Sequence, residues 1–222
     1  MLQVSAGQSR GKPFFLFWIL VIEHGTFNDQ NILWSQHMTL MEHIQRYTLA
    51  DYAQWPGDWE LIQGQPVAMT PSPGVSHQRI SLKIARQLDE QLEGCSLCTV
   101  VFETDWEVAE DTAVRPDIMV LCDEFQERVQ RRPELIVEVV SDSSARLDER
   151  IKYQLYAEEG VPWYILAYPK HNKAKIYQIS KGIYCKIDDF CFGTWFFDIR
   201  GCSGRLDFSK VWAHSSGERV QE

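Results

Sequence analysis

The segment at residues 134–140 reads ELIVEVV and constrains the fold more than any other part of the chain. It is a short run of branched apolar residues, which is typical of a central β-strand buried on both faces. Glu138 is the exception inside this run, because a carboxylate is costly to bury unless it is protonated, paired or bound to a cation. The segment therefore predicts a buried sheet and an acidic position within it that needs a partner.

Hydrophobic periodicity indicates the elements around this run. Apolar residues recur at four-residue steps along residues 76–92, which predicts a helix with one buried face. A second helix is expected over residues 144–159, because serines that favour an N-cap precede it and Gly160 follows it. We expect a short helix at residues 39–49 and strands at residues 59–62, 65–69, 97–109, 115–121, 161–168, 175–179 and 182–187. This order predicts an α/β domain, with a mixed β-sheet flanked by a few helices.

The first 37 residues share neither periodicity nor a motif with the rest of the chain. We interpret residues 1–37 as an N-terminal extension, disordered or produced by an over-long gene start, and residues 38–222 as one domain. The apolar segment at residues 14–22 is far shorter than the roughly 20 residues of a membrane-spanning helix, and no small-residue cleavage motif follows it. We therefore expect no membrane partner, no export and a cytoplasmic location.

The chain is acidic, with a formal net charge of -9 and an isoelectric point near 5.2. This balance argues against a general nucleic-acid coat protein, which presents a broad basic face. Small basic clusters occur within residues 128–132 and 146–152, and either could touch a phosphate backbone, although such clusters are usually solvated. Any contact with DNA is therefore expected to be local or assisted by a metal ion.

Six cysteines are present, and Cys95 and Cys98 form a single CxxC motif. A structural zinc ion needs two more ligands, and the chain has no second CxxC and no HxxxH motif. A chain of this length does not need disulfides to stabilise its fold. We therefore interpret all six cysteines as reduced thiols and expect no zinc.

A second carboxylate complements Glu138, since Asp117 opens the apolar strand expected at residues 115–121. Two neighbouring strands could bring both carboxylates to the same end of the sheet. Oxygen ligands of this kind suit a hard cation such as Mg²⁺. In the alternative interpretation Asp117 only ends a strand, and Glu138 forms a buried ion pair with Arg115 or Arg150.

Residues 115–117 (RPD) followed by residues 136–140 (IVEVV) resemble the PD-(D/E)XK pattern of the restriction-endonuclease-like superfamily. The pattern expects a lysine two positions after the glutamate, where this chain has Val140. In some branches of the superfamily the lysine comes from the next helix, and Lys152 is in that position. Tyr156 follows Lys152 at i+4, so the two share one helix face.

A longer set of fragments resembles the Uma-type family of putative restriction endonucleases. The resemblance runs from about residue 38 to residue 177, and the order and spacing of the fragments are more specific than any one of them. The fragments are WELIQG at 59–64, MTPSP at 69–73, HQRI at 77–80, RPD at 115–117, VEVVS at 137–141, the Lys152 and Tyr156 pair, and GVPWY at 160–164.

The resemblance implies a nuclease fold and an endonuclease, a hydrolase acting on the phosphodiester bonds of DNA with Mg²⁺ or Mn²⁺ as cofactor. It implies that Asp117 and Glu138 hold the metal ion. Lys152 would orient the attacking water or neutralise charge developing on the phosphate. Glu60 would supply a further acidic group, and Tyr156 would accompany Lys152 in the catalytic site.

Because Val140 stands where the pattern expects a lysine, a second function stays open. In that case the chain is a catalytically inactive nucleic-acid-binding or interaction module that retains the nuclease fold. A lysine on a helix is usually solvated, Tyr156 could pack in the core, and His77 at the start of a helix is more often a cap or a surface residue. The sequence leaves the oligomeric state open, a homodimer included.

Overall fold

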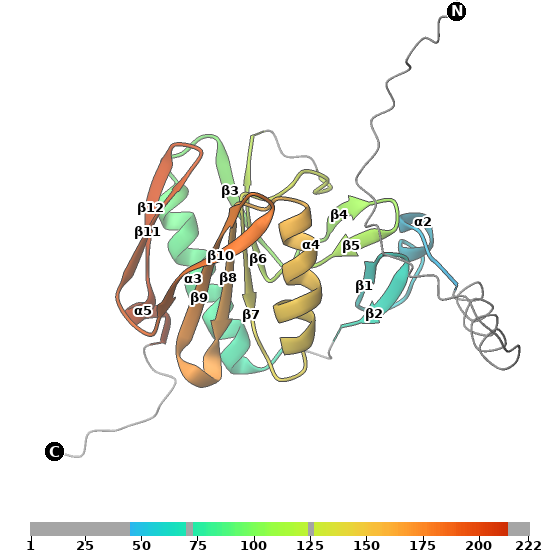
Figure 1. Ribbon diagram of the computed structural model, residues 1–222, viewed down its shortest axis with the longest axis horizontal. Helices are drawn as coiled ribbons and strands as arrows, with labels where there is room; N and C mark the ends of the chain where they lie inside the picture. Colours follow the sequence, from blue (N-terminus) through green and yellow to red (C-terminus); the bar gives the residue numbers. More distant parts are fainter. Residues whose placement is uncertain (1–44, 70–72, 124–126, 213–222) are drawn as a thin grey trace, which may run out of the picture. The chain divides into compact units, whose positions relative to one another are not determined.

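The computed structural model describes residues 45–69, 73–123 and 127–212 of the chain (Figure 1). The expectations for residues 1–37, and most of the short helix expected at residues 39–49, lie outside the described residues. The first described helix is α2 (Leu49–Tyr52). Within these described ranges no helix is long and apolar enough to cross a membrane.

A six-stranded sheet lies at the centre of the described part of the chain. Its strands are β3 (Cys98–Phe102), β6 (Ile118–Cys122), β7 (Leu135–Val139), β8 (Trp163–Tyr168), β9 (Lys173–Ser180) and β10 (Ile183–Phe190). The strand order is β10-β9-β8-β7-β6-β3, in which β7 and β8 run parallel and the other neighbours are antiparallel. Every residue of β6 and β7 is buried. The predicted α/β fold with a mixed sheet and few helices is confirmed.

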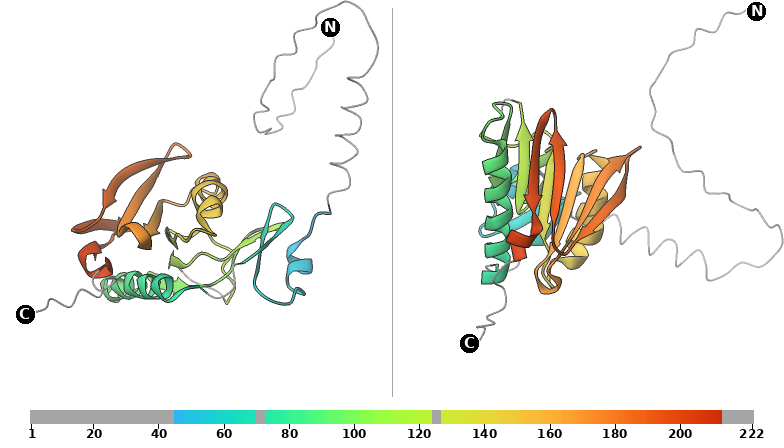
Figure 2. Two further views of the ribbon diagram at one scale, coloured as in Figure 1. Left: turned by 90° about the horizontal axis from the view of Figure 1, so that it is seen from below. Right: turned by 90° about the vertical axis from the view of Figure 1, so that its left-hand side faces the viewer.

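Different elements cover the two faces of this sheet (Figure 2). One face packs against α3 (Val75–Leu92), β11 (Thr194–Ile199), β12 (Cys202–Asp207) and α5 (Phe208–Trp212), and the other against α4 (Tyr153–Glu158). Val137 and Val139 belong to the α3 core, whereas Ile136 and Val140 belong to the α4 core. Because side chains alternate along a strand, Glu138 lies on the α4 face.

A smaller antiparallel sheet brings another acidic residue to β6. It consists of β1 (Trp59–Ile62), β2 (Gln65–Ala68), β4 (Trp106–Ala109) and β5 (Thr112–Val114), in the order β2-β1-β5-β4. The hairpin of β1 and β2 is the one that the sequence predicts. Arg115 connects β5 to β6, and its backbone N–H donates to Oε1 of Glu60 on β1 over 2.7 Å. Glu60 is therefore held beside the start of β6.

Several parts of the chain differ from the expected elements. The strand expected over residues 97–109 is two strands, β3 and β4, in different sheets. The chain turns between them at Glu103, whose φ of 48° interrupts the extended backbone. The short β5 and the elements after residue 190, β11, β12 and α5, are absent from the expected set. A short 3₁₀ helix (Pro169–His171) also connects β8 to β9.

The expectation that all six cysteines are reduced is wrong for four of them. Disulfides join Cys95 to Cys202 and Cys98 to Cys122, while Cys185 and Cys191 are free and exposed. The paired residues are separated by 107 and 24 positions, so only the three-dimensional fold brings them together.

Candidate active site

Lys152 lies at the centre of a buried acidic cluster. Its Nζ is 2.8 Å from Oε1 of Glu60, 3.1 Å from Oε1 of Glu138 and 3.9 Å from Oδ1 of Asp148. The exposed fractions are 1% for Glu60, 2% for Glu138, 3% for Asp148 and 4% for Lys152. This lysine is therefore not the solvated residue that its position on a helix would usually indicate.

A π-helical turn delivers Lys152 to this cluster. The sequence predicts one helix over residues 144–159, but the chain forms a π-helix (Leu147–Lys152) that continues into α4. Tyr164 on β8 donates from its hydroxyl to the backbone oxygen of Asp148 over 3.0 Å and fixes the turn against the sheet. π-Helical turns inside helices occur frequently at functional sites.

Asp117 and Glu138 lie at the same end of two neighbouring strands. Asp117 immediately precedes β6, and the antiparallel register pairs Ile118 with Val137. The Asp117 N–H donates to Oε2 of Glu138 over 3.3 Å, and the Val139 N–H donates to Oδ2 of Asp117 over 2.6 Å. The structure thus brings together the two carboxylates to which the family resemblance assigns a metal ion.

Tyr156 contacts the same carboxylate as Lys152. Its hydroxyl donates to Oε1 of Glu138 over 2.8 Å, and its side chain is fully buried. Burial and the neighbouring Glu138 carboxylate raise the pKa of Tyr156 well above its ordinary value. The hydroxyl therefore stays protonated and acts as a hydrogen-bond donor.

Glu138 does not form the buried ion pair with Arg115 or Arg150 that the alternative interpretation expects. The guanidinium of Arg115 instead pairs with Asp105 at 2.7 Å and with Asp58 at 2.9 Å. The cation beside Glu138 is Lys152. Glu60 is the second carboxylate in contact with Lys152. Its Oε1 accepts from both the Arg115 backbone N–H and the Lys152 ammonium.

Burial and charge act against each other in this cluster. Burial raises the pKa of Glu138, an effect that Lys152 opposes, and burial raises the pKa of Asp148 to about 6. Burial disfavours the charge of Lys152, but the carboxylates of Glu138 and Glu60 outweigh it and raise the pKa of the lysine. Lys152 is therefore charged at neutral pH.

Two residues of the site are missing from the sequence-based set. Asp148 is one, and its only signal is the i, i+4 spacing to Lys152. His77 is the other, because its Nε2 lies 3.2 Å from Oδ2 of Asp117 and the ring is mostly buried, so it is neither a cap nor a surface residue. Its Nδ1 is buried and has no hydrogen-bond partner among the described residues. Burial opposes the imidazolium, but the hydrogen bond to Asp117 raises the pKa of His77.

The donor set of the cluster fits a hard divalent cation. The cluster contains four carboxylates (Glu60, Asp117, Glu138 and Asp148) and one lysine, and His77 adds a positive charge only when protonated. Within the described ranges, the closest contacts of the Asp117 and Glu60 carboxylates use Oδ2 of Asp117 and Oε1 of Glu60. Carboxylate oxygens of this kind are the ligands that Mg²⁺ and Mn²⁺ prefer.

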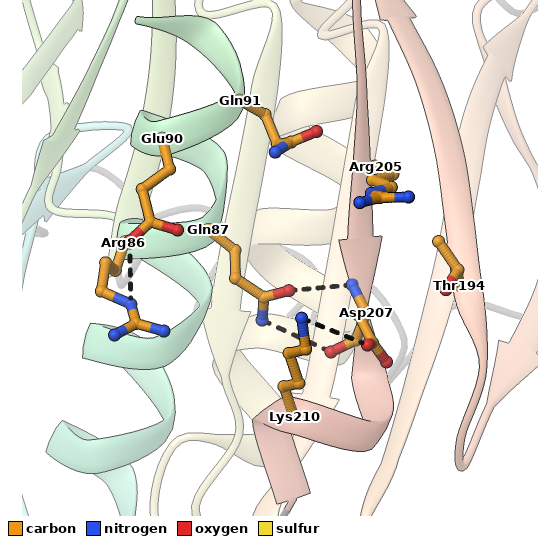
Figure 3. A pocket seen from close by; sticks show the side chains of 8 residues that line it. All are labelled: Arg86, Gln87, Glu90, Gln91, Thr194, Arg205, Asp207 and Lys210. Carbon is orange, nitrogen blue, oxygen red and sulfur yellow. Dashed lines mark hydrogen bonds and ion pairs between the residues drawn. The ribbon is translucent and has the colours of Figure 1, made fainter.

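A pocket of about 210 Å³ lies elsewhere, between α3 and the β11–β12 hairpin (Figure 3). Four of its charged groups are paired, Arg86 with Glu90 at 3.4 Å and Lys210 with Asp207 at 3.8 Å. Gln87 is also paired, since its amide oxygen accepts from the Asp207 N–H. This pocket is on the opposite face of the sheet from Lys152 and is separate from the candidate site.

Comparison with known proteins agrees with the fold. The model of the Uma2 family, described as "Putative restriction endonuclease", matches residues 49–193. The structure is similar to a crystal structure described as a putative nuclease belonging to DUF820 from Anabaena variabilis, with a TM-score of 0.62. That similarity has 14% sequence identity and covers 75% of this chain and 97% of the other, so it shows the fold alone. None of the curated proteins matches the chain. Because the family match spans more than half of its length, the chain belongs to the Uma2 family of restriction-endonuclease-like proteins.

Proposed function

We propose that this protein is a Mg²⁺- or Mn²⁺-dependent endonuclease that hydrolyses phosphodiester bonds of DNA in the cytoplasm. One observation carries the proposal, the contact of a buried, charged Lys152 with Glu60 and Glu138, where Glu138 also contacts Asp117 at the start of β6. Burying a lysine and several carboxylates costs desolvation free energy, and perturbed ionisable groups of this kind concentrate at functional sites.

Asp117 and Glu138 are the proposed metal ligands. Their carboxylates are fixed relative to each other by hydrogen bonds through the backbones of Asp117 and Val139. Glu60 and Asp148 are the nearest further carboxylates, and they help to neutralise the combined charge of a divalent ion and Lys152. A divalent ion bound here supplies Lewis acidity and lowers the pKa of a coordinated water.

Lys152 is the proposed catalytic lysine, in place of the residue missing at Val140. Both side chains belong to the α4 side of the sheet, so the ammonium reaches the end of β7 from the helix instead of from the strand. A compact ammonium can stabilise charge on a phosphate and can orient a water molecule. Tyr156 is a positioning residue, because its hydroxyl holds the Glu138 oxygen that Lys152 also contacts.

The acidic net charge supports a role for the cation in substrate binding. A net charge of -9 repels the phosphate backbone, and non-specific affinity for DNA arises from released counterions at basic contacts. The protein is therefore expected to engage DNA locally, at the metal site, and not through a broad basic face.

The test is a magnesium titration by calorimetry combined with cleavage of supercoiled plasmid DNA. Asp117→Ala and Glu138→Ala should each lose Mg²⁺ binding and cleavage, and EDTA should abolish cleavage by the parent protein. Asp89→Ala, which removes an exposed carboxylate of α3, is the matched control and should behave as the parent. The alternative, a silent DNA-binding module, predicts DNA binding without cleavage in either Mg²⁺ or Mn²⁺.

A further inference from the structure

Four of the six cysteines gather on the α3 side of the central sheet, opposite to the Lys152 cluster. Cys95 follows α3, Cys98 begins β3, Cys122 ends β6 and Cys202 begins β12. All four belong to or pack against the core between the sheet and α3. Three separate parts of the chain, the CxxC segment, the end of β6 and the start of β12, thus contribute four sulfurs to a single location.

The two disulfides, Cys95–Cys202 and Cys98–Cys122, are not independent of each other. The sulfur atoms of Cys95, Cys98 and Cys202 all lie within 4.8 Å of one another, and Cys98 is bonded to Cys122. Four thiolates around a zinc ion, each about 2.3 Å from it, lie roughly 4 Å apart. Two independent disulfides do not require the sulfur atoms of one to lie close to those of the other, whereas a tetrahedral ion bound by all four sulfurs does.

The local backbone also suits a metal site. The N–H of Cys95 donates to the Leu92 oxygen over 2.8 Å, and the N–H of Cys98 donates to the Cys95 oxygen over 3.3 Å. These bonds fold the CxxC segment into a tight turn that presents two sulfurs together. Cys98 and Cys122 stand directly opposite in the antiparallel register, with Cα atoms 4.0 Å apart, so their side chains share one face. A CxxC turn with two further cysteines from other strands is a common structural zinc arrangement.

We propose that the reduced protein binds one Zn²⁺ through the thiolates of Cys95, Cys98, Cys122 and Cys202, and that the two disulfides are its oxidised, metal-free state. Conversion needs a dithiol reductant. Two equivalents are oxidised to disulfides and transfer four electrons and four protons, which gives four thiols on the protein. Zinc binding then releases these four protons. The ion links β12 and the end of α3 to β3 and β6, and its role is structural.

The experiment uses the full chain, reduced anaerobically with a dithiol, incubated with ZnCl₂ and desalted. Elemental analysis should find about one zinc per chain, as expected for a single four-thiolate site. Replacement by Co²⁺ should produce sulfur-to-cobalt charge-transfer absorption and the visible bands of tetrahedral cobalt. Cys122→Ser and Cys202→Ser should lose the bound zinc and these bands, whereas Cys185→Ser and Cys191→Ser, which alter exposed free cysteines, should keep both.

Asp117→Ala and Glu138→Ala test whether the bound zinc depends on the carboxylate cluster. Both variants should retain zinc and the cobalt–sulfur absorption. The parent protein alone decides the outcome if a cysteine variant fails to fold. A fully reduced, folded parent that retains no zinc and gives no cobalt–sulfur absorption would overturn the proposal. Zinc retained undiminished by folded Cys122→Ser and Cys202→Ser would overturn it equally.

Discussion

At the scale of single residues, the site depends on how one oxygen of Glu138 is shared. Oε1 accepts a hydrogen bond from Tyr156 and another from Lys152, while Oε2 accepts from the backbone of Asp117. A buried carboxylate with this many donors is held in one orientation. Each donor therefore has a separable effect on stability and on the geometry of the proposed metal ligand.

Tyr156→Phe removes one of these donors and leaves the ring in place. We expect a loss of about 1–3 kcal/mol in the free energy of unfolding, because a buried acceptor loses a partner. We also expect slower DNA cleavage, because the orientation of Glu138 relaxes. Tyr153→Phe is the matched control, since its hydroxyl bonds to the Tyr184 backbone outside the cluster. Urea unfolding and cleavage rates check both variants, and equal cleavage rates for the two would contradict a positioning role for Tyr156.

Asp148 predicts a pH dependence of stability in the metal-free protein. Burial raises its pKa to about 6 in the folded state, above its ordinary value of 3.8. The folded protein therefore holds this proton more tightly than the unfolded chain, and the free energy of unfolding falls as pH rises from about 4 to 6. Asp148→Asn should reduce this fall by up to about 3 kcal/mol. Urea unfolding in EDTA between pH 4 and 7 measures this pH dependence, with Asp89→Asn at an exposed carboxylate as control. If Asp148→Asn leaves the pH dependence of the free energy of unfolding unchanged, Asp148 is not its source.

At the scale of elements, the β11–β12 hairpin packs closely on the α3 face. A Cβ atom added at Gly204 on β12 would lie 2.4 Å from the ring of Phe197, which is itself buried in the core of that face. The close approach of backbone to ring explains why a glycine occurs in the middle of this strand.

Gly204→Ala should therefore destabilise the protein by about 1–3 kcal/mol through overpacking. Gly94→Ala is the control, since an added Cβ there meets no atom within 4 Å. Thermal unfolding compares the two variants. Because the hairpin covers the face opposite Lys152, cleavage below the melting transition should be unchanged in both. A melting temperature equal to that of the parent would show that the hairpin can shift to accommodate the methyl group.

At the scale of the whole molecule, the sequence predicts the central strands well because burial on both faces produces uninterrupted apolar runs. The strand pair around Asp117 and Glu138 is predicted for this reason, and the family resemblance adds Glu60, Lys152 and Tyr156. Each of these residues lies in the cluster.

Other features depend on contacts that no local pattern reveals. Asp148 sits in a run of charged residues and has the pattern of a solvated helix, so only the fold shows its burial. The alternation of Trp195, Phe197 and Ile199 is the sequence signal for β11. The exposed aromatic Phe196 lies within this segment and obscures the alternation of apolar and polar residues. The convergence of Cys95 with Cys202 likewise depends on the packing of β12 against α3.

The most direct test of the central claim is the rate of DNA cleavage by Lys152→Ala in saturating Mg²⁺, measured beside Mg²⁺ binding by the same protein. Lys170→Ala, which removes an exposed lysine, is the control, and circular dichroism verifies that both variants are folded. We expect Lys152→Ala to lose about 100-fold or more in cleavage rate with magnesium binding almost intact, because the lysine acts on the phosphate or the water and not on the ion. A folded Lys152→Ala protein that cleaves DNA as fast as the parent would contradict the proposed catalytic role of Lys152.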